Sequence, residues 1–419
     1  MRGFLRQIDP KLPRDVWLLQ LGGVVNSFGN GVVFPFLAIY LHDVRGFSLA
    51  TAGIAIAISS VGQTGAVLAL GPLIDRLGAR RMLASGLLLQ AVGFGLLPLV
   101  SAPWHAYVLM AVEGLGPAAF WPSQSTPIPA LTPQPPRHAA FAQQRVTMNL
   151  GIGLGGLVGG LIASVSDPTT FTVLFVLDAF TFGAYVLVLG LVAEPPREPH
   201  VEGSGSYREV LGHRVFLGLW TLNFLFVAFG YSLLNLLPPF ARDHSGLDET
   251  QIGAIFFLNT IVIVVMQLPI SRWIEGRRRM RALALMPLMW AAAWLLVDAA
   301  GAWLEATTAF VAFGIAVIVI GVGECFHGPA HQALVADLAP DRLRGRYFSV
   351  HSMSWGVGGV VGPALGGFLL ESAPFALWAL ASAVCLSAAA GALALERAVP
   401  GRLRRIPAAP PLEPAPVQV

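Results

Sequence analysis

The sequence predicts an all-α membrane protein with twelve transmembrane helices in two pseudo-symmetric six-helix bundles. Its 419 residues are 55% hydrophobic and only 12% charged, with a mean hydropathy of +0.69. The apolar runs are about 20 residues long or more, enough to cross a bilayer as helices. They lack the strict alternation of a membrane β-barrel. A repeat relates the two halves of the chain, which points to duplicated bundles.

The apolar runs divide into six before and six after a hydrophilic linker, which we place at residues 193–214. The N-terminal bundle is predicted over 16–192 and the C-terminal bundle over 215–396. Residues 1–15 form a short N-terminal segment, and 397–419 a tail whose prolines predict disorder. The expected spans are 16–40, 49–74, 82–101, 104–131, 141–166, 170–192, 215–241, 250–274, 282–300, 303–335, 345–371 and 374–396.

Basic residues give the expected orientation, because Lys and Arg are retained on the cytoplasmic side of a membrane. An N-terminus inside leaves only Arg45 and Arg242, of 26 Lys and Arg, on the outer side. Both termini are therefore expected in the cytoplasm, with the protein in the plasma membrane, or the inner membrane of a cell that has two. The basic residues are scattered over many loops, so a nucleic-acid partner is not expected.

An internal repeat connects the fourth and fifth spans with the tenth and eleventh. A shift of 207 residues superposes eleven identical residues without a gap, and the paired spans have the same orientation in the membrane. Transporters commonly carry such duplicated halves with the binding site between them. The pairs include Gly114 with Gly321, Pro122 with Pro329, Arg137 with Arg344, Gly151 with Gly358, and Gly160 with Gly367.

The loop after the second span carries a recognisable motif, Gly-Pro-Leu-Ile-Asp-Arg-Leu-Gly-Ala-Arg-Arg over residues 71–81. It resembles the G-x-L-x-D-R-x-G-R-R signature of the major facilitator superfamily, with the basic pair shifted by one position. The resemblance implies a conformational latch, whose charge pairs of about 1 kcal/mol each can bias two states without locking either. A solvated basic loop is the simpler alternative. The latch residues would be Gly71, Asp75, Arg76, Gly78, Arg80 and Arg81.

Glycines four residues apart mark the fifth and eleventh spans. The eleventh is similar to the G-x-x-x-G-P-x-x-G-G element of the family's proton-coupled antiporters, whereas Gly156 replaces the proline in the fifth. The family's arginine in the fourth span is absent, since Met110 stands there. Small residues let helices approach closely, so we expect a packed hinge, or simply close packing. The hinge set is Gly151, Gly155, Gly159, Gly160, Gly358, Gly362, Pro363, Gly366 and Gly367.

Ionisable side chains inside spans are costly and therefore commonly functional. Glu113, Asp178, Glu324 and His327 are the candidates for proton coupling, with structural hydrogen bonding as the alternative. Glu324, His327 and His331 are spaced to share one helical face, with His331 expected to line the cytoplasmic vestibule. A metal site would need further ligands that the sequence does not offer.

Polar and aromatic residues of the central spans are the candidates for substrate contact. A mostly apolar cavity with a few amides and acids suits amphipathic or cationic compounds. Each of these residues could equally hydrogen-bond between helices. The set is Asn26, Asn30, Gln63, Phe120, Trp121, Asn149, Asn223, Tyr231, Asn235 and Asn259.

Together these observations predict a secondary active transporter that works by alternating access, most consistent with proton-coupled, multidrug-type efflux of small hydrophobic or cationic compounds. The alternatives are a major facilitator transporter of one metabolite, by uniport, symport or antiport, and a membrane sensor that does not transport. We expect no enzymatic activity, because protease, hydrolase and phosphate-binding motifs are absent from the sequence. The expected partners are a small-molecule substrate, protons and the lipid bilayer, with no cofactor and a monomeric state.

Overall fold

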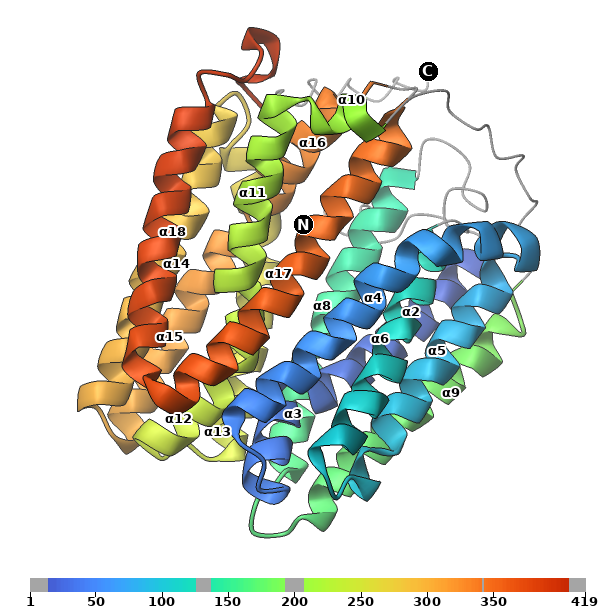
Figure 1. Ribbon diagram of the computed structural model, residues 1–419, viewed down its shortest axis with the longest axis vertical. Coiled ribbons are helices and arrows are strands. Elements are labelled where there is room, and N and C mark those ends of the chain that lie inside the picture. Colours follow the sequence, from blue (N-terminus) through green and yellow to red (C-terminus); the bar gives the residue numbers. More distant parts are fainter. Residues whose placement is uncertain (1–13, 126–136, 193–206, 341–342, 407–419) are drawn as a thin grey trace, which may run out of the picture.

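The computed structural model describes residues 14–125, 137–192, 207–340 and 343–406, and these residues are almost entirely helical. Figure 1 shows long helices running roughly side by side. We call the elements from α2 to α9 the N-terminal group. They are α2 (Arg14–Val33), η1 (Phe34–Phe36), α3 (Leu37–Ile39), η2 (Tyr40–Val44), α4 (Leu49–Leu77), α5 (Ala79–Gly95), η3 (Leu97–Leu99), α6 (Pro103–Ser125), α8 (Arg137–Ile162) and α9 (Thr169–Leu189).

The elements after residue 206 form the C-terminal group. Several are short pieces that continue one another, because prolines and glycines interrupt the regular helix. They are α10 (Tyr207–Leu211), α11 (Arg214–Phe229), η4 (Tyr231–Asn235), α12 (Leu237–Ser245), α13 (Glu249–Trp273), α14 (Arg279–Trp303), α15 (Ala306–Glu324), η5 (Gly328–Gln332), α16 (Ala333–Leu338), α17 (Arg344–Ser372), α18 (Pro374–Leu395) and η7 (Gly401–Leu403).

Helices pack closely within each group and also between the groups. α2 packs on α8 and α9 and α5 on α6, while α14 packs on α15 and α18 and α11 on α17. Large aromatic side chains fill the interior of the C-terminal group, including the fully buried Trp290, Trp294 and Trp378. Two helix pairs join the groups, α4 with α17 and α8 with α13. Movement of one group against the other would change the contacts within these two pairs.

The helices have the length and composition of membrane spans. Within the described residues, ten runs are long and apolar enough to cross a bilayer, and Met148–Ile162 of α8 is a shorter apolar helix. Large apolar side chains point outward, among them Phe180 at 71% and Leu187 at 76% exposure, as expected for a surface that faces lipid. The chain is thus a multi-pass membrane protein. Its count of twelve spans stays a prediction.

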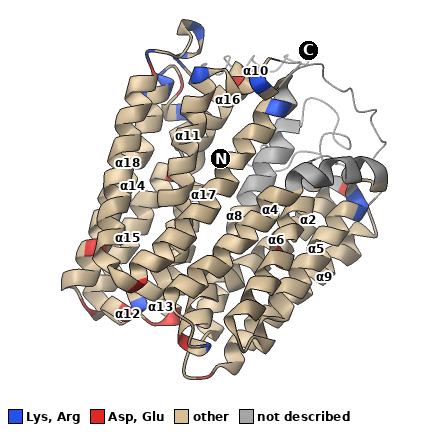
Figure 2. Ribbon diagram, in the orientation of Figure 1, with Lys and Arg blue, Asp and Glu red and all other residues tan. Residues whose placement is uncertain are grey.

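The two ends of the helices differ in charge, as Figure 2 shows. Arginines gather at one end, which we call the basic end and which includes residues 274–279 and 396–406. Acidic residues gather at the other, which we call the acidic end and which includes residues 43–48, 163–168 and 242–249. The asymmetry matches the distribution predicted from the sequence.

Candidate functional site

Two of the predicted proton-coupling carboxyls are buried in the N-terminal group. Glu113 of α6 is 6% exposed and accepts a hydrogen bond from the Ser59 hydroxyl of α4. Asp178 of α9 is fully buried, and its Oδ1 lies 3.4 Å from the Thr181 hydroxyl while its Oδ2 has no hydrogen-bond partner. The helices that carry them, α6 and α9, both pack on α5. Within the described part of the chain neither carboxyl is paired with Arg or Lys, which is the arrangement expected of a group that takes up and releases a proton.

The C-terminal group holds a cluster of histidines. His327 lies with Nε2 2.8 Å from Asn223 Oδ1, and Asn223 donates to the Ser354 hydroxyl at 2.8 Å. The rings of His327 and His331 stack with centroids 5.0 Å apart, and the His351 ring lies 5.3 Å beyond. The cluster therefore connects α11, η5 and α17 through side-chain contacts.

Two features of this cluster differ from the sequence prediction. His331 does not line a vestibule: it is fully buried and its Nε2–H donates to the Leu219 carbonyl at 2.9 Å. The regular helix expected through Glu324, His327 and His331 is interrupted, because α15 ends at Glu324 and a wider helical turn, η5, follows from Gly328, although the His327 and His331 rings still stack. Glu324 is half-buried at that break.

Spacing did not single out His351, although neither of its ring nitrogens has a hydrogen-bond partner and it is 6% exposed. It is an isolated histidine in an apolar run, and only the fold brings it to His331. The sequence offered no spacing signal for Gln20 or Gln90 either, both of which are buried in the N-terminal group. Among the described residues, no group of three or more His, Cys, Asp or Glu is placed to hold a metal ion.

The predicted substrate contacts separate by helix group. Asn223 and Tyr231 belong to the histidine cluster, since the Tyr231 ring packs on Trp290, His327 and Trp355. Asn259 donates to the Val317 carbonyl of α15 at 3.0 Å, which is hydrogen bonding between helices of one group. Asn235 is buried in η4.

The N-terminal candidates are arranged differently. Asn26 is buried with its Oδ1 unpaired, and its backbone carbonyl accepts from the Asn30 side chain at 2.9 Å. Gln63 and Asn149 are half-buried. The Phe120 ring packs against Tyr185 at 6.2 Å, and the Trp121 side chain lies outside the described residues. Only Asn26 among these is a buried amide with an unpaired atom.

The predicted hinge glycines fall on two faces of their helices. On α8, Cβ atoms added at Gly151, Gly155 and Gly159 would collide with α2 or with η1, inside the N-terminal group. On α17, Cβ atoms at Gly358, Gly362 and Gly366 would likewise collide with α11, η4 or the Leu236 side chain next to η4, inside the C-terminal group. Glycine is therefore needed for tight packing within each group.

Gly160 and Gly367 face the other group instead. A Cβ at Gly160 would lie 2.5 Å from the Glu249 carbonyl oxygen and 2.8 Å from the Gly253 Cα of α13. A Cβ at Gly367 would lie 2.6 Å from the Leu49 carbonyl oxygen and 3.1 Å from the Gly53 Cα of α4. The two joints are thus equivalent, as the internal repeat predicts. Pro363 of α17 and Gly156 of α8 occupy matching places. The Pro363 carbonyl faces Gly53, and the Gly156 carbonyl faces Gly253.

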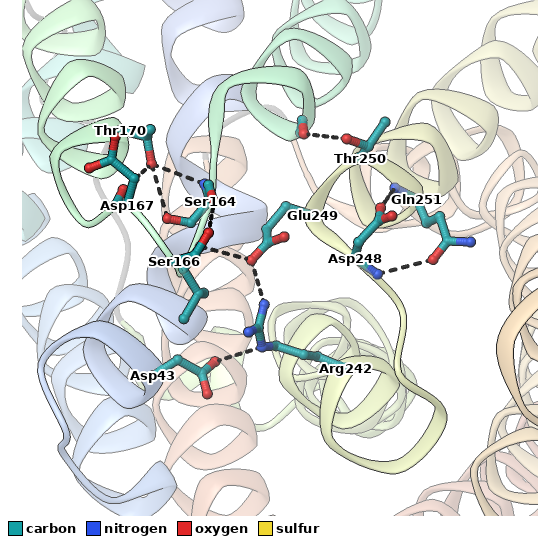
Figure 3. Close-up of polar contacts among 12 residues, drawn as sticks. Asp43, Ser164, Ser166, Asp167, Thr170, Arg242, Asp248, Glu249, Thr250 and Gln251 are labelled. Atoms are coloured by element: carbon teal, nitrogen blue, oxygen red, sulfur yellow. Dashed lines mark hydrogen bonds and ion pairs between the residues drawn. The ribbon is translucent and has the colours of Figure 1, made fainter.

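Figure 3 shows the polar contacts that reinforce the α8–α13 joint at the acidic end. Arg242 of α12 forms an ion pair with Glu249 of its own group and lies 3.5 Å from Asp43 of the N-terminal group. Glu249 also accepts from the backbone N–H of Val165 at 3.1 Å. Because the three charged side chains are largely shielded from water, we expect these contacts to be stronger than those of exposed pairs. We call Asp43, Arg242, Glu249 and Val165 the polar clasp.

Local structure places Glu249 in the clasp. Asp248 caps α13, its side chain accepting from the Gln251 N–H at 2.7 Å while Gln251 accepts from the Asp248 N–H at 3.0 Å, a reciprocal cap that fixes the first turn (Figure 3). Thr250 in the same turn donates to the Gly160 carbonyl at 3.0 Å. From the sequence, Arg242 could be identified only as one of two basic residues expected on the outer side.

The predicted latch loop is only partly described. Gly78 precedes α5 with a φ of 88°, a conformation that favours glycine. Arg80 donates to the Val192 carbonyl at 3.0 Å, which ties the start of α5 to the end of the N-terminal group. Arg81 is exposed. Gly71, Asp75 and Arg76 lie in helix α4, but their side chains are outside the described residues. The latch itself stays a prediction.

These features define a multi-pass helical protein with buried ionisable groups and two joints between helix groups. The chain belongs to the Major Facilitator Superfamily, whose family model matches residues 19–319 and 219–418. It is therefore a membrane transporter and not an enzyme, as the sequence predicted.

Relatives and solved structures agree with this family. The chain is 26% identical over 371 residues to the multidrug resistance protein MdtH of Cronobacter sakazakii, covering 85% of this chain and 86% of that protein, and equally similar to MdtH of Salmonella typhimurium. Its fold resembles the nucleoside transporter NupG, with a TM-score of 0.77 at 13% identity over 91% of this chain and 100% of that one. It also resembles a bacterial homolog of the lysosomal transporter Spinster, with a TM-score of 0.67 at 14% identity over 91% and 94% of the two chains.

Proposed function

We propose that this transporter exports small hydrophobic or cationic compounds in exchange for protons. Two six-helix bundles, the N-terminal and C-terminal groups, alternate access to a site between them. The basic end lies in the cytoplasm with both termini, and the acidic end faces outward. The relatives named as multidrug resistance proteins support this class of substrate, since they align over most of the chain.

The buried carboxyl pair of Glu113 and Asp178 is the observation that carries the proposal. An exporter driven by a proton gradient needs a group inside the membrane that binds a proton from one side and releases it to the other. Two carboxyls without a basic partner in the described structure can serve, because protonating one removes a charge that is costly to bury. His327 and Glu324 are further candidates in the C-terminal group.

Closure of the acidic end fits the same cycle. The two glycine joints and the polar clasp hold the helix groups together at that end, which corresponds to the outward side being shut. Substrate would then enter from the cytoplasm, and protonation of the carboxyl pair would accompany the opposite state. The latch loop with Asp75 would restrain the basic end in that state, as the family resemblance implies.

Proton exchange in reconstituted liposomes tests the proposal. We expect the purified protein to release protons on addition of several unrelated drugs, and Glu113→Gln and Asp178→Asn each to reduce this release about tenfold or more. Both variants should still exchange labelled substrate for unlabelled substrate, because that exchange requires no net proton movement. Glu305, an exposed acidic residue that directly precedes α15, provides the matched control, and Glu305→Gln should behave as the parent.

The alternatives predict different results. Flux of a single substrate that ignores pH would favour a transporter of one metabolite. Drug-induced proton release that is unchanged in both carboxyl variants would overturn the assignment of the proton site. No flux of any compound would favour a sensor.

A further inference from the structure

The C-terminal segment after α18 folds back onto the loop between α13 and α14. The Gly276 N–H donates to the Ile406 carbonyl at 2.9 Å, and the Ile406 N–H donates to the Arg277 carbonyl at 3.0 Å. The Arg279 N–H donates to the Arg404 carbonyl at 2.8 Å. Residues 396–406 are therefore held against residues 274–279 by backbone pairing, although the two segments are far apart in sequence.

This pairing concentrates arginines at one place on the basic end. We call the set the arginine patch; all its members are exposed except Arg404, which is half-buried. The two segments contain only two acidic residues, and one of them, Glu396, is buried between Arg278 at 2.9 Å and Arg281 at 3.4 Å. The patch comprises Arg272, Arg277, Arg278, Arg281, Arg397, Arg402, Arg404 and Arg405.

The patch lies where three candidate spans begin or end, Glu249–Trp273, Arg279–Trp303 and Pro374–Leu395. Residues at the ends of spans are expected at the level of the lipid headgroups. Trp273 at the end of α13 is 50% exposed, and the Arg277 guanidinium lies 3.9 Å from the centroid of its ring. Tryptophan is typical of the membrane–water interface, where its apolar ring meets the headgroups.

Membrane topology alone does not explain this arrangement. Retention on the cytoplasmic side requires only that arginines lie on that side, as they do in several other loops of this chain. Here backbone pairing holds the arginines of residues 397–405 against those of residues 277–279, and like charges gathered on one surface repel one another. A bound anion offsets that repulsion, and guanidinium groups match the geometry of phosphate.

We infer that the arginine patch binds the headgroups of anionic phospholipids in the leaflet that faces the basic end. Basic clusters next to membrane spans attract anionic lipid, with a contribution that falls as salt is raised. The site is separate from the proton and substrate sites, so it does not depend on the proposed direction of transport. Bound lipid would anchor the C-terminal segment against the α13–α14 loop.

Native mass spectrometry of the full-length protein with cardiolipin, phosphatidylglycerol or phosphatidylcholine tests this inference. We expect the two anionic lipids to stay bound and the zwitterionic lipid not to. Arg397→Gln combined with Arg402→Gln should weaken binding of anionic lipid roughly tenfold. Neither side chain has a described contact within the protein, so folding should be unaffected. Arg208→Gln combined with Arg214→Gln, from the same end but outside the patch, removes the same charge and should change binding less than twofold.

Thermal unfolding provides a second measurement. Anionic lipid should raise the unfolding temperature of the parent and of the Arg208 and Arg214 variant, and raise it less for the Arg397 and Arg402 variant. Equal lipid retention by the two double variants would overturn the inference. So would equal stabilisation by soluble glycerol phosphate at the same concentration, since the site would then bind free phosphate rather than a membrane lipid.

Discussion

The two joints between the helix groups have the same backbone contact but different polar reinforcement. At α8–α13, Gly160 meets Gly253, and the polar clasp and Thr250 add hydrogen bonds and the ion pair of Arg242 with Asp43 of the other group. At α4–α17, Gly367 meets Gly53, and the added polar contact is the Ala50 N–H donating to Glu371 at 3.0 Å. Glycine thus sets how closely the groups approach, whereas the side chains determine how strongly the closed end is held.

This difference suggests that the backbone contacts and the polar contacts have separate roles. A contact of backbone against backbone is either made or lost, since no side chain can move aside. The polar contacts at the acidic end can exchange with water, so they can be broken at moderate cost during a transport cycle. We expect substitutions at the glycines to stop closure, and substitutions in the clasp to shift its population.

The glycines should show the largest effect. Gly160→Ala and Gly367→Ala would each place a methyl group against the backbone of the other helix group, and overpacking of this kind costs about 1–3 kcal/mol. We expect the closed state of the acidic end, and transport with it, to fall roughly tenfold or more in either variant. Distances between spin labels on residues 163–168 and 246–248 would measure the opening.

Gly183→Ala is the control for both variants, because a Cβ there meets nothing within 4 Å. If Gly160→Ala kept the parental label distances and transport rate, the joint would not limit closure. If only one of the two joint variants affected closure, the equivalence of the joints would fail.

The clasp should show an intermediate effect. Arg242→Gln removes the charge that attracts Asp43 across the groups and that pairs with Glu249. We expect the closed state to lose about 1 kcal/mol of stability, which lowers the population of the closed end roughly fivefold. Glu371→Gln at the other joint keeps an acceptor for the Ala50 N–H and should change the population less than twofold. The same label distances measure both variants, and equal effects would remove the contrast between the joints.

The smallest effect concerns pH at the acidic end. Burial raises the pKa of Asp243 above its usual range. Attraction to His42, His244 and Arg242 lowers that pKa but does not cancel the effect of burial. The acidic residues of the polar clasp, Asp43 and Glu249, both contact Arg242. Above that pKa the Asp243 carboxylate is ionised and is attracted to His42 of the other group, at 3.9 Å. As pH falls through the pKa the attraction is lost, so acid should favour opening.

Because both side chains are about one-third exposed, we expect a change below twofold in the closed population. Asp243→Asn should flatten the dependence of the label distances on pH in the range where the parent's Asp243 gains its proton, which the raised pKa places above the usual range of an aspartate. A slope unchanged in this variant would assign the pH response to another group.

Much of the architecture could be predicted because membrane spans are encoded locally. The span expected over 170–192 corresponds to α9 (Thr169–Leu189), and the span over 250–274 to α13 (Glu249–Trp273). A long apolar run must satisfy its own backbone hydrogen bonds in lipid, so helix type and position follow from composition. The burial of Glu113 and Asp178 was likewise predictable, because both stand within such runs.

The site was less predictable, since it depends on which helix faces which. Gly159 and Gly160 are adjacent in one motif, yet Gly159 packs inside its own group and Gly160 meets the other group. The clasp joins Asp43, Val165, Arg242 and Glu249 from segments whose sequences carry no shared motif. His331 was expected near the cytoplasmic surface and is fully buried, because α11 covers it with the Leu219 backbone.

By itself the sequence determined the membrane class, the position of most helices, the asymmetry of charge between the two ends and the duplication of the halves. Hydrophobic burial in lipid and backbone hydrogen bonding act within a single helix, so they can be read residue by residue. Only the tertiary structure decided the partners of the glycines, the polar clasp, the histidine cluster and the arginine patch. Those contacts depend on distances between segments remote in the chain, which helix packing alone fixes.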